Sequence, residues 1–174
     1  MAKNIYGGGK QTNINGLKFE QETDLQDALS NVPGYEIINN VIYYNGEYIG
    51  MLAKKHDLYK LILNPRGINY KEYISKQLLP DEALFLEKTN TIFIIEKKFQ
   101  NVGGSVDEKL QTFGFKIYQY SKLFDPLKIK VKYFYLLNDW FKKPQYKDIL
   151  DYMEINGCKY FFNEIPLNFL ELPN

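Results

Sequence analysis

The apolar segments of this chain are short, and their length limits the folds that the chain can adopt. Two of the longest, Thr91–Ile95 and Tyr133–Leu137, have the length of β-strands. No stretch approaches the ~20 apolar residues of a membrane-spanning helix, so no membrane association is expected. A chain of 174 residues can bury a substantial core. We therefore expect one domain over residues 1–174 that is built partly from β-strands.

Helical and strand patterns alternate along the chain. Apolar residues recur at helical spacing from Leu17 to Val32, where Pro33-Gly34 ends the pattern. Tyr35–Ile49 is expected to form two strands joined by a turn at Asn45-Gly46. The other expected elements are a helical or strand segment at Asp57–Leu63, strands at Ala83–Glu87, Thr91–Phe99, Leu127–Leu137 and Lys159–Ile165, and helices at Tyr70–Gln77, Val106–Phe124 and Gln145–Ile155. This order predicts a mixed α/β fold with a central sheet flanked by helices.

Composition narrows the class of protein. The chain has 22 Lys and Arg against 21 Asp and Glu, and its net charge of +1 argues against a simple electrostatic coat for nucleic acid. The single cysteine, Cys158, cannot form an internal disulfide, which favours a reducing compartment and a cytoplasmic protein. Met1–Gly9 lacks the apolar segment of a secretory signal.

Charged residues end the second of two neighbouring expected strands. Glu96-Lys97-Lys98 directly follows an apolar segment, and Asp81 precedes the other strand. Because side chains alternate along a strand, Glu96 and Lys98 share one face. A two-residue loop between the strands would pair Asp81 with Lys98, whereas a three-residue loop would bring Glu82 opposite Glu96. Both registers bring two carboxylates and an amine together.

Two carboxylates that face each other across a strand pair repel each other unless a cation lies between them. Oxygen ligands with open coordination suit Mg²⁺, which keeps several waters and pairs with phosphate oxygens. Such a metal can activate water and stabilise the charge that develops during phosphodiester hydrolysis, while a neighbouring lysine orients the water. The alternative interpretation is a hairpin end held by salt bridges.

Pro80-Asp81 followed by Glu96-Lys97-Lys98 has the pattern P-D…(D/E)-x-K, which resembles the PD-(D/E)XK nuclease superfamily and particularly small type II restriction endonucleases. Two further segments are similar to that group. They are Gly104–Thr112 and the N-terminal stretch from Gly7 to Glu20. The resemblance implies a restriction-endonuclease-like fold with a central mixed β-sheet flanked by helices.

The resemblance also implies roles for the residues of the motif. Asp81 and Glu96 would be metal ligands together with the backbone carbonyl of Lys97, and Lys98 would position the attacking water. Glu20 would be an outer or second-metal ligand from an N-terminal helix, with Glu22 as its substitute if that helix is rotated. The alternative for Glu20 is a place on a solvated helix face.

Several polar residues around this motif are candidate DNA contacts. They are Lys54, Lys55, Arg66, Gln100, Ser105 and Lys109. Lys54 and Lys55 could equally belong to a solvated turn, and Arg66 could form a structural ion pair or a bidentate contact to guanine. Gly7–Gly9 could contact DNA or be a floppy terminus. His56 and Cys158 alone cannot form a zinc site.

We therefore expect a Mg²⁺-dependent type II restriction endonuclease that cleaves double-stranded DNA at a short site, acting as a homodimer. The alternatives are a Holliday-junction resolvase or repair nuclease of the same fold, or a non-catalytic DNA-binding module. On this interpretation the near-zero net charge is the sum of an acidic and a basic patch. Weak DNA binding without metal should then strengthen with Ca²⁺ or Mg²⁺.

Overall fold

The computed structural model describes residues 15–174 of the chain. The Gly7–Gly9 segment, for which a DNA contact was considered, lies outside the described residues. None of the helices in the described part is long and apolar enough to cross a membrane.

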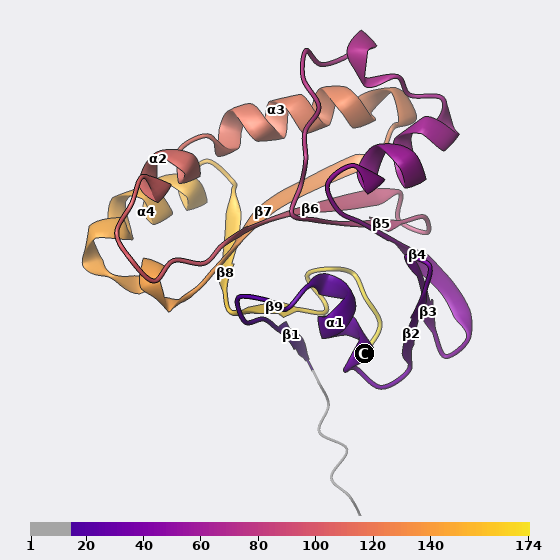
Figure 1. The fold of residues 1–174 in the computed structure, drawn as a ribbon, viewed down its shortest axis with the longest axis horizontal. Coiled ribbons are helices and arrows are strands. Elements are labelled where there is room, and N and C mark those ends of the chain that lie inside the picture. Colours follow the sequence, from indigo (N-terminus) through magenta and orange to yellow (C-terminus); the bar gives the residue numbers. More distant parts are fainter. Residues whose placement is uncertain (1–14) are drawn as a thin grey trace, which may run out of the picture.

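A seven-stranded mixed sheet forms the centre of the molecule, with the strand order β2-β3-β4-β5-β6-β7-β8. Its strands are β2 (Tyr35–Ile38), β3 (Val41–Tyr44), β4 (Glu47–Ala53), β5 (Glu82–Leu86), β6 (Thr91–Lys98), β7 (Lys130–Leu137) and β8 (Lys159–Phe162). Neighbours from β2 to β6 are antiparallel, whereas β6, β7 and β8 are parallel. The expected mixed α/β architecture with a central sheet and flanking helices is confirmed (Figure 1).

Different elements cover the two faces of the sheet (Figure 1). One face carries the π-helix η1 (Leu58–Leu63) and the α-helices α2 (Val106–Leu110), α3 (Phe113–Phe124) and α4 (Lys147–Ile155). The other face carries α1 (Leu25–Ser30) and a ribbon of β1 (Gly16–Lys18) and β9 (Glu164–Pro166). Short 3₁₀ turns connect these elements: η2 (Asn64–Arg66), η3 (Tyr70–Glu72), η4 (Asp125–Leu127), η5 (Asp139–Lys142) and η6 (Pro144–Tyr146).

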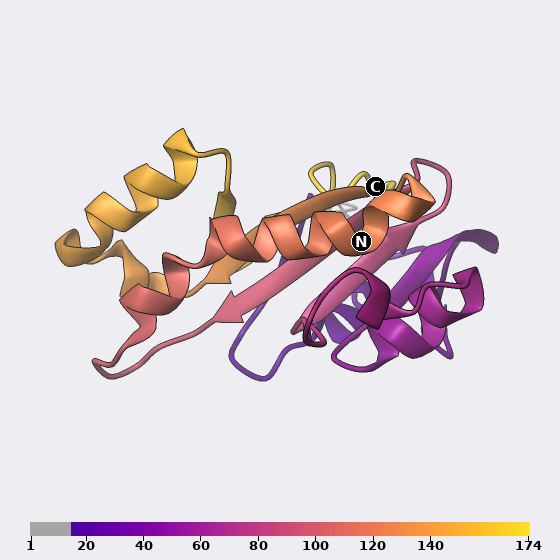
Figure 2. The ribbon, with the colours of Figure 1, turned by 90° about the horizontal axis from the view of Figure 1, so that it is seen from above.

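The central strand β6 is apolar on both sides because both faces of the sheet are covered. Ile92 and Ile94 pack in the core under α3, while Phe93 and Ile95 pack in the core beside α1. Viewed from above, α3 runs over the sheet on the β6–β7 side (Figure 2). A strand that is buried on two faces has an almost continuous apolar sequence. Polar residues can therefore gather only where β6 ends.

The prediction of an N-terminal helix from Leu17 to Val32 is wrong for the first half of this range. Residues Gly16–Lys18 form β1 instead, and Leu17 pairs with Ile165 of β9. The helix begins only at Leu25, where the side chain of Asp24 accepts a hydrogen bond from the backbone N–H of Asp27 at 2.8 Å. Backbone pairing with a distant strand outweighs the helical spacing of the apolar residues.

Two helices and one turn differ from the sequence-based expectation. The long helix over Val106–Phe124 is divided by a turn into α2 and α3, although it begins at the expected residue. A second tight turn at Asn39-Asn40, where both residues have positive φ, makes three strands of Tyr35–Ala53. The expected turn at Asn45-Gly46 is confirmed. The helix expected at Tyr70–Gln77 is reduced to a single 3₁₀ turn.

Candidate active site

The β5–β6 hairpin sets the positions of the charged residues. Leu86 pairs with Thr91 across a four-residue turn, and Glu82 pairs with Ile95. Both registers considered from the sequence are therefore wrong. Continuing the observed register by one residue brings Asp81 directly opposite Glu96. Because opposite residues of an antiparallel pair lie on the same face, the carboxylates of Asp81 and Glu96 converge at the open end of the hairpin.

Lys98 lies between these two carboxylates. Its Nζ atom is 3.2 Å from Oε2 of Glu96 and 3.7 Å from Oδ2 of Asp81. The same Oδ2 atom accepts a hydrogen bond of 3.0 Å from the backbone N–H of Lys97. We refer to Asp81, Glu96 and Lys98 as the hairpin-end site.

Lys55 makes a fourth charged contact at the hairpin-end site. Its ammonium group forms an ion pair with Oδ1 of Asp81. The backbone also brings the two residues together, since the N–H of Lys55 donates to the carbonyl of Pro80 at 2.9 Å. Asp81 therefore has one carboxylate oxygen bound to Lys55 and the other bound to Lys97 and Lys98.

The pKa values of the two carboxyl groups shift in opposite directions. Burial opposes ionisation of Asp81, but the contacts with Lys55, Lys98 and the Lys97 N–H outweigh it and lower the pKa of Asp81. Burial raises the pKa of Glu96, and the charge of Asp81 raises it further against the opposing effect of Lys98. Opposite shifts are typical of two carboxylates that share one site.

A second polar cluster, which the P-D…E-x-K motif does not indicate, lies on the opposite face of the same two strands. The ammonium group of Lys97 donates to the carbonyls of Gln21 at 2.5 Å and Thr23 at 2.8 Å. Oε1 of Glu82 accepts a hydrogen bond of 3.3 Å from the N–H of Leu25, the first residue of α1. Side-chain alternation along β5 and β6 would have placed Glu82 and Lys97 on this face. Their contacts fasten the segment before α1 to the sheet.

Glu20 lies between β1 and α1, not on a helix, and its side chain is exposed. Its backbone N–H donates to the Oγ1 atom of Thr23 at 3.2 Å. Glu22 is also exposed in this segment. Among the residues that the structure describes, no three acidic, histidine or cysteine side chains are grouped to hold a metal ion. The structure thus does not bring Glu20 together with Asp81 and Glu96.

The donors at the hairpin-end site suit a small, hard cation. Asp81 and Glu96 offer carboxylate oxygens, and the carbonyl of Lys97 lies 3.4 Å from the Nζ atom of Lys98. In the described structure, lysine ammonium groups neutralise both carboxylates. Mg²⁺ binds to proteins through one or two carboxylates and keeps several waters, so these three protein ligands fit one such ion.

The candidate DNA contacts lie in different places. Lys54 and Lys55 are at the end of β4 beside the site, where Lys54 pairs with Asp24 at 2.7 Å. Arg66 lies beside the other end of β5, where its partner Glu87 is roughly 20 Å from Asp81 along the strand. It contacts Glu87 at 3.2 Å and stacks on Phe85. The structure therefore separates Arg66 from the site, and these contacts match the structural ion pair considered from the sequence.

The remaining candidates follow β6. The backbone of Gln100 exchanges two hydrogen bonds with the side chain of Asn138, which ties the end of β6 to the end of β7. Ser105 and Lys109 are exposed just before and within α2. All three thus lie in the segment that leaves the hairpin-end site.

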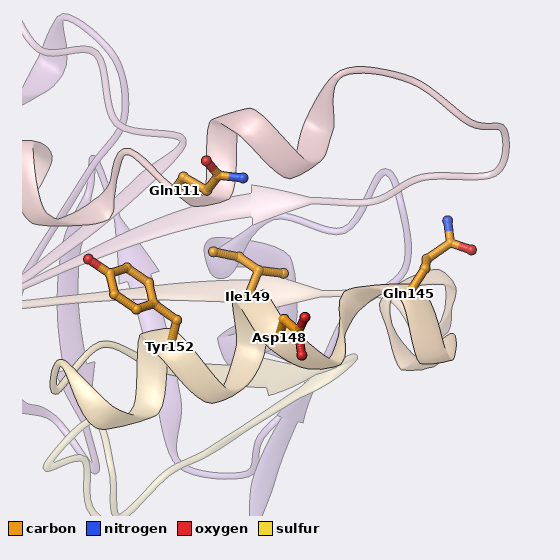
Figure 3. Close-up of a pocket in the computed structure, with 5 residues that line it drawn as sticks. All are labelled: Gln111, Gln145, Asp148, Ile149 and Tyr152. Atoms are coloured by element: carbon orange, nitrogen blue, oxygen red, sulfur yellow. The ribbon is translucent and has the colours of Figure 1, made fainter.

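A separate hollow lies between the end of α2 and helix α4 (Figure 3). Its lining residues are Gln111, Gln145, Asp148, Ile149 and Tyr152. Figure 3 shows Gln111 on one side of the hollow and Asp148, Ile149 and Tyr152 on α4 across from it. Asp148 is the one carboxylate among these lining residues, and none of them belongs to the hairpin-end site.

Comparison with protein-family models, with curated proteins and with solved structures found no match to this chain.

Proposed function

We propose that this protein is a Mg²⁺-dependent, sequence-specific DNA endonuclease of the type II restriction kind. The observation that carries the proposal is the position of Asp81 opposite Glu96, with Lys98 in contact with both. The P-D…E-x-K pattern alone is compatible with many structures. Its residues meet on one face at one end of a hairpin, and this arrangement supports a common chemical role.

The connection that follows the motif gives further support. After β6 the chain forms α2 and α3 and returns as β7, which is parallel to β6. The open end of the β5–β6 hairpin thus lies where the central strands of the sheet end. Ligand sites of sheets with parallel strands commonly lie beyond the carboxyl ends of those strands. Glu96 and Lys98 are at the carboxyl end of β6.

The proposed reaction is hydrolysis of a DNA phosphodiester bond. Asp81, Glu96 and the Lys97 carbonyl would hold Mg²⁺, which supplies charge stabilisation and a more acidic water. Lys98 would donate a hydrogen bond to the attacking water and orient its oxygen toward phosphorus. The attacking water gives up a proton to solvent as its oxygen forms the new P–O bond, while the bond to the leaving sugar oxygen breaks and that oxygen takes up a proton from solvent.

Residues 15–174 of one chain contain one such site, whereas cutting both strands requires two. A two-fold homodimer would supply both sites and match a palindromic target. Restriction of DNA at a short site is therefore our preferred function within the nuclease class. Cleavage of branched or damaged DNA, and binding without cleavage, are alternative outcomes of the same experiment.

The experiment incubates the purified protein with supercoiled plasmid and Mg²⁺, with or without EDTA. Discrete fragments that disappear with EDTA are expected for a restriction enzyme. Asp81→Asn and Glu96→Gln should each reduce cleavage at least 100-fold, on the order of the loss of a group that stabilises the transition state. The matched control is Glu87→Gln, since Glu87 lies at the opposite end of β5.

Each result has a distinct interpretation. Smeared DNA would indicate a nuclease without sequence specificity, and shifted but uncut DNA would indicate a binding module. Undiminished cleavage by both Asp81→Asn and Glu96→Gln would show that the site is assigned wrongly. Mapping fragment ends on DNA of known sequence would identify the target and the cut positions.

A further inference from the structure

The backbone of the sheet, and not only a flexible side chain, brings Lys55 close to Asp81. Ala53 at the end of β4 pairs with Ala83 of β5, and continuing this register brings Lys55 opposite Asp81. The backbone hydrogen bond from Lys55 to Pro80 extends the pairing beyond the strands. Lys55 has a left-handed backbone with φ 50°. Asp81 is thus flanked by Lys55 on one side and by Glu96 on the other.

The ion pair between Lys55 and Asp81 affects the charge balance of the hairpin-end site. Asp81 and Glu96 carry two potential negative charges, and Lys55 and Lys98 supply two positive ones. A divalent ion added to this set would raise the local charge by two and would compete with Lys55 for Oδ1 of Asp81. The Lys55 side chain is 53% exposed, so it can leave Asp81 without unpacking the core.

We propose that Lys55 is an internal counter-ion of Asp81 that is exchanged when metal and DNA bind. Without them its ammonium group neutralises Asp81. A DNA phosphate at the site attracts this ammonium group and frees Oδ1 for the metal. Lys55 thereby couples the two binding events, and each ligand increases the affinity for the other. This inference rests on the proposed function, since it requires metal and DNA at the hairpin-end site.

The first experiment measures the affinity for Mn²⁺ alone, without DNA, by electron paramagnetic resonance. Lys55→Met removes a competing ion pair and a positive charge, so it should bind Mn²⁺ about three- to tenfold more tightly than wild type. Lys55→Gln should shift the affinity in the same direction. Lys55→Arg keeps the charge and should remain within about twofold of wild type.

Lys54→Met is the matched control. The side chains of Lys54 and Lys55 are both 53% exposed, and each forms one ion pair, but Lys54 pairs with Asp24. Removing Lys54 tests how a more distant positive charge affects the metal. Solvent screening should keep its effect on Mn²⁺ affinity without DNA below about twofold.

The second experiment measures binding of a fluorescent DNA duplex in EDTA and in Ca²⁺. Wild type should bind more tightly in Ca²⁺. In Lys55→Met this gain should fall by the same three- to tenfold factor, on the order expected for a charge pair of this kind, because Lys55 no longer needs to be released. An equal gain in the two proteins would overturn the proposed coupling.

The results also separate this inference from the proposed function. If neither wild type nor Lys55→Met binds Mn²⁺, or if Asp81→Asn binds it as tightly as wild type, the metal site is wrong and both proposals fail. If binding depends on Asp81 but Lys55→Met has wild-type affinity, the counter-ion role alone is wrong.

Discussion

The buried carboxyl group of Glu82 should make the stability of this protein fall as the pH rises. Burial raises the pKa of Glu82 from 4.5 to about 7 in the folded chain, against the opposing hydrogen bond from the Leu25 N–H. Between these two pH values the folded state binds more protons at this group than the unfolded state. The contribution of Glu82 to the free energy of unfolding is therefore fully present below pH 4.5 and is lost as the pH rises toward 7.

The size of the effect follows from the two pKa values. Each unit between the folded and unfolded pKa corresponds to about 1.4 kcal/mol, so ionised Glu82 should cost roughly 3 kcal/mol of folding free energy above pH 7. Glu82→Gln keeps an oxygen that can accept from the Leu25 N–H but cannot ionise. The variant should match wild type at pH 4.5 and become more stable than wild type by up to that amount above pH 7.

Urea denaturation in EDTA, followed by circular dichroism across this pH range, measures the free energy of unfolding of both proteins. Glu36→Gln is the control, because Glu36 is exposed on β2 and should leave the pH dependence unchanged. Parallel pH profiles for wild type and Glu82→Gln would refute the reasoning, since they would mean that Glu82 has the same pKa in the folded and unfolded chains.

Three further perturbations test other parts of the structure. Asn138→Ala removes both hydrogen bonds to Gln100 and should lower the free energy of unfolding by about 1–3 kcal/mol in urea denaturation. Phe93→Ala empties a fully buried position that packs against Phe169, so calorimetry should show a loss of about 3–5 kcal/mol. Glu20→Gln alters an exposed side chain and should change stability by less than about 0.5 kcal/mol. Plasmid cleavage by this variant then tests the ligand role, and undiminished cleavage would exclude it.

Local patterns in the sequence were sufficient to predict where the central strands lie in the chain. Apolar segments of strand length that end in turn residues correctly located β5, β6 and β7. The shared face of Glu96 and Lys98 also follows from the sequence, because residues two positions apart in any strand point the same way.

Contacts between distant segments decided the rest. Gly16–Lys18 is a strand because β9 pairs with it from the other end of the chain, and no local pattern could reveal that partner. This pairing removed Glu20 from its expected helix. The length of the β5–β6 turn set Asp81 opposite Glu96, although the sequence had favoured shorter loops.

The sequence by itself thus determined which residues could form a site on β6 and that they would lie at the end of a buried strand. Only the tertiary structure brought Lys55 to Asp81, and Glu82 to the start of α1. The physical reason is that side-chain alternation acts within one strand. The register between strands depends on turns and on backbone pairing among segments that are far apart in the chain.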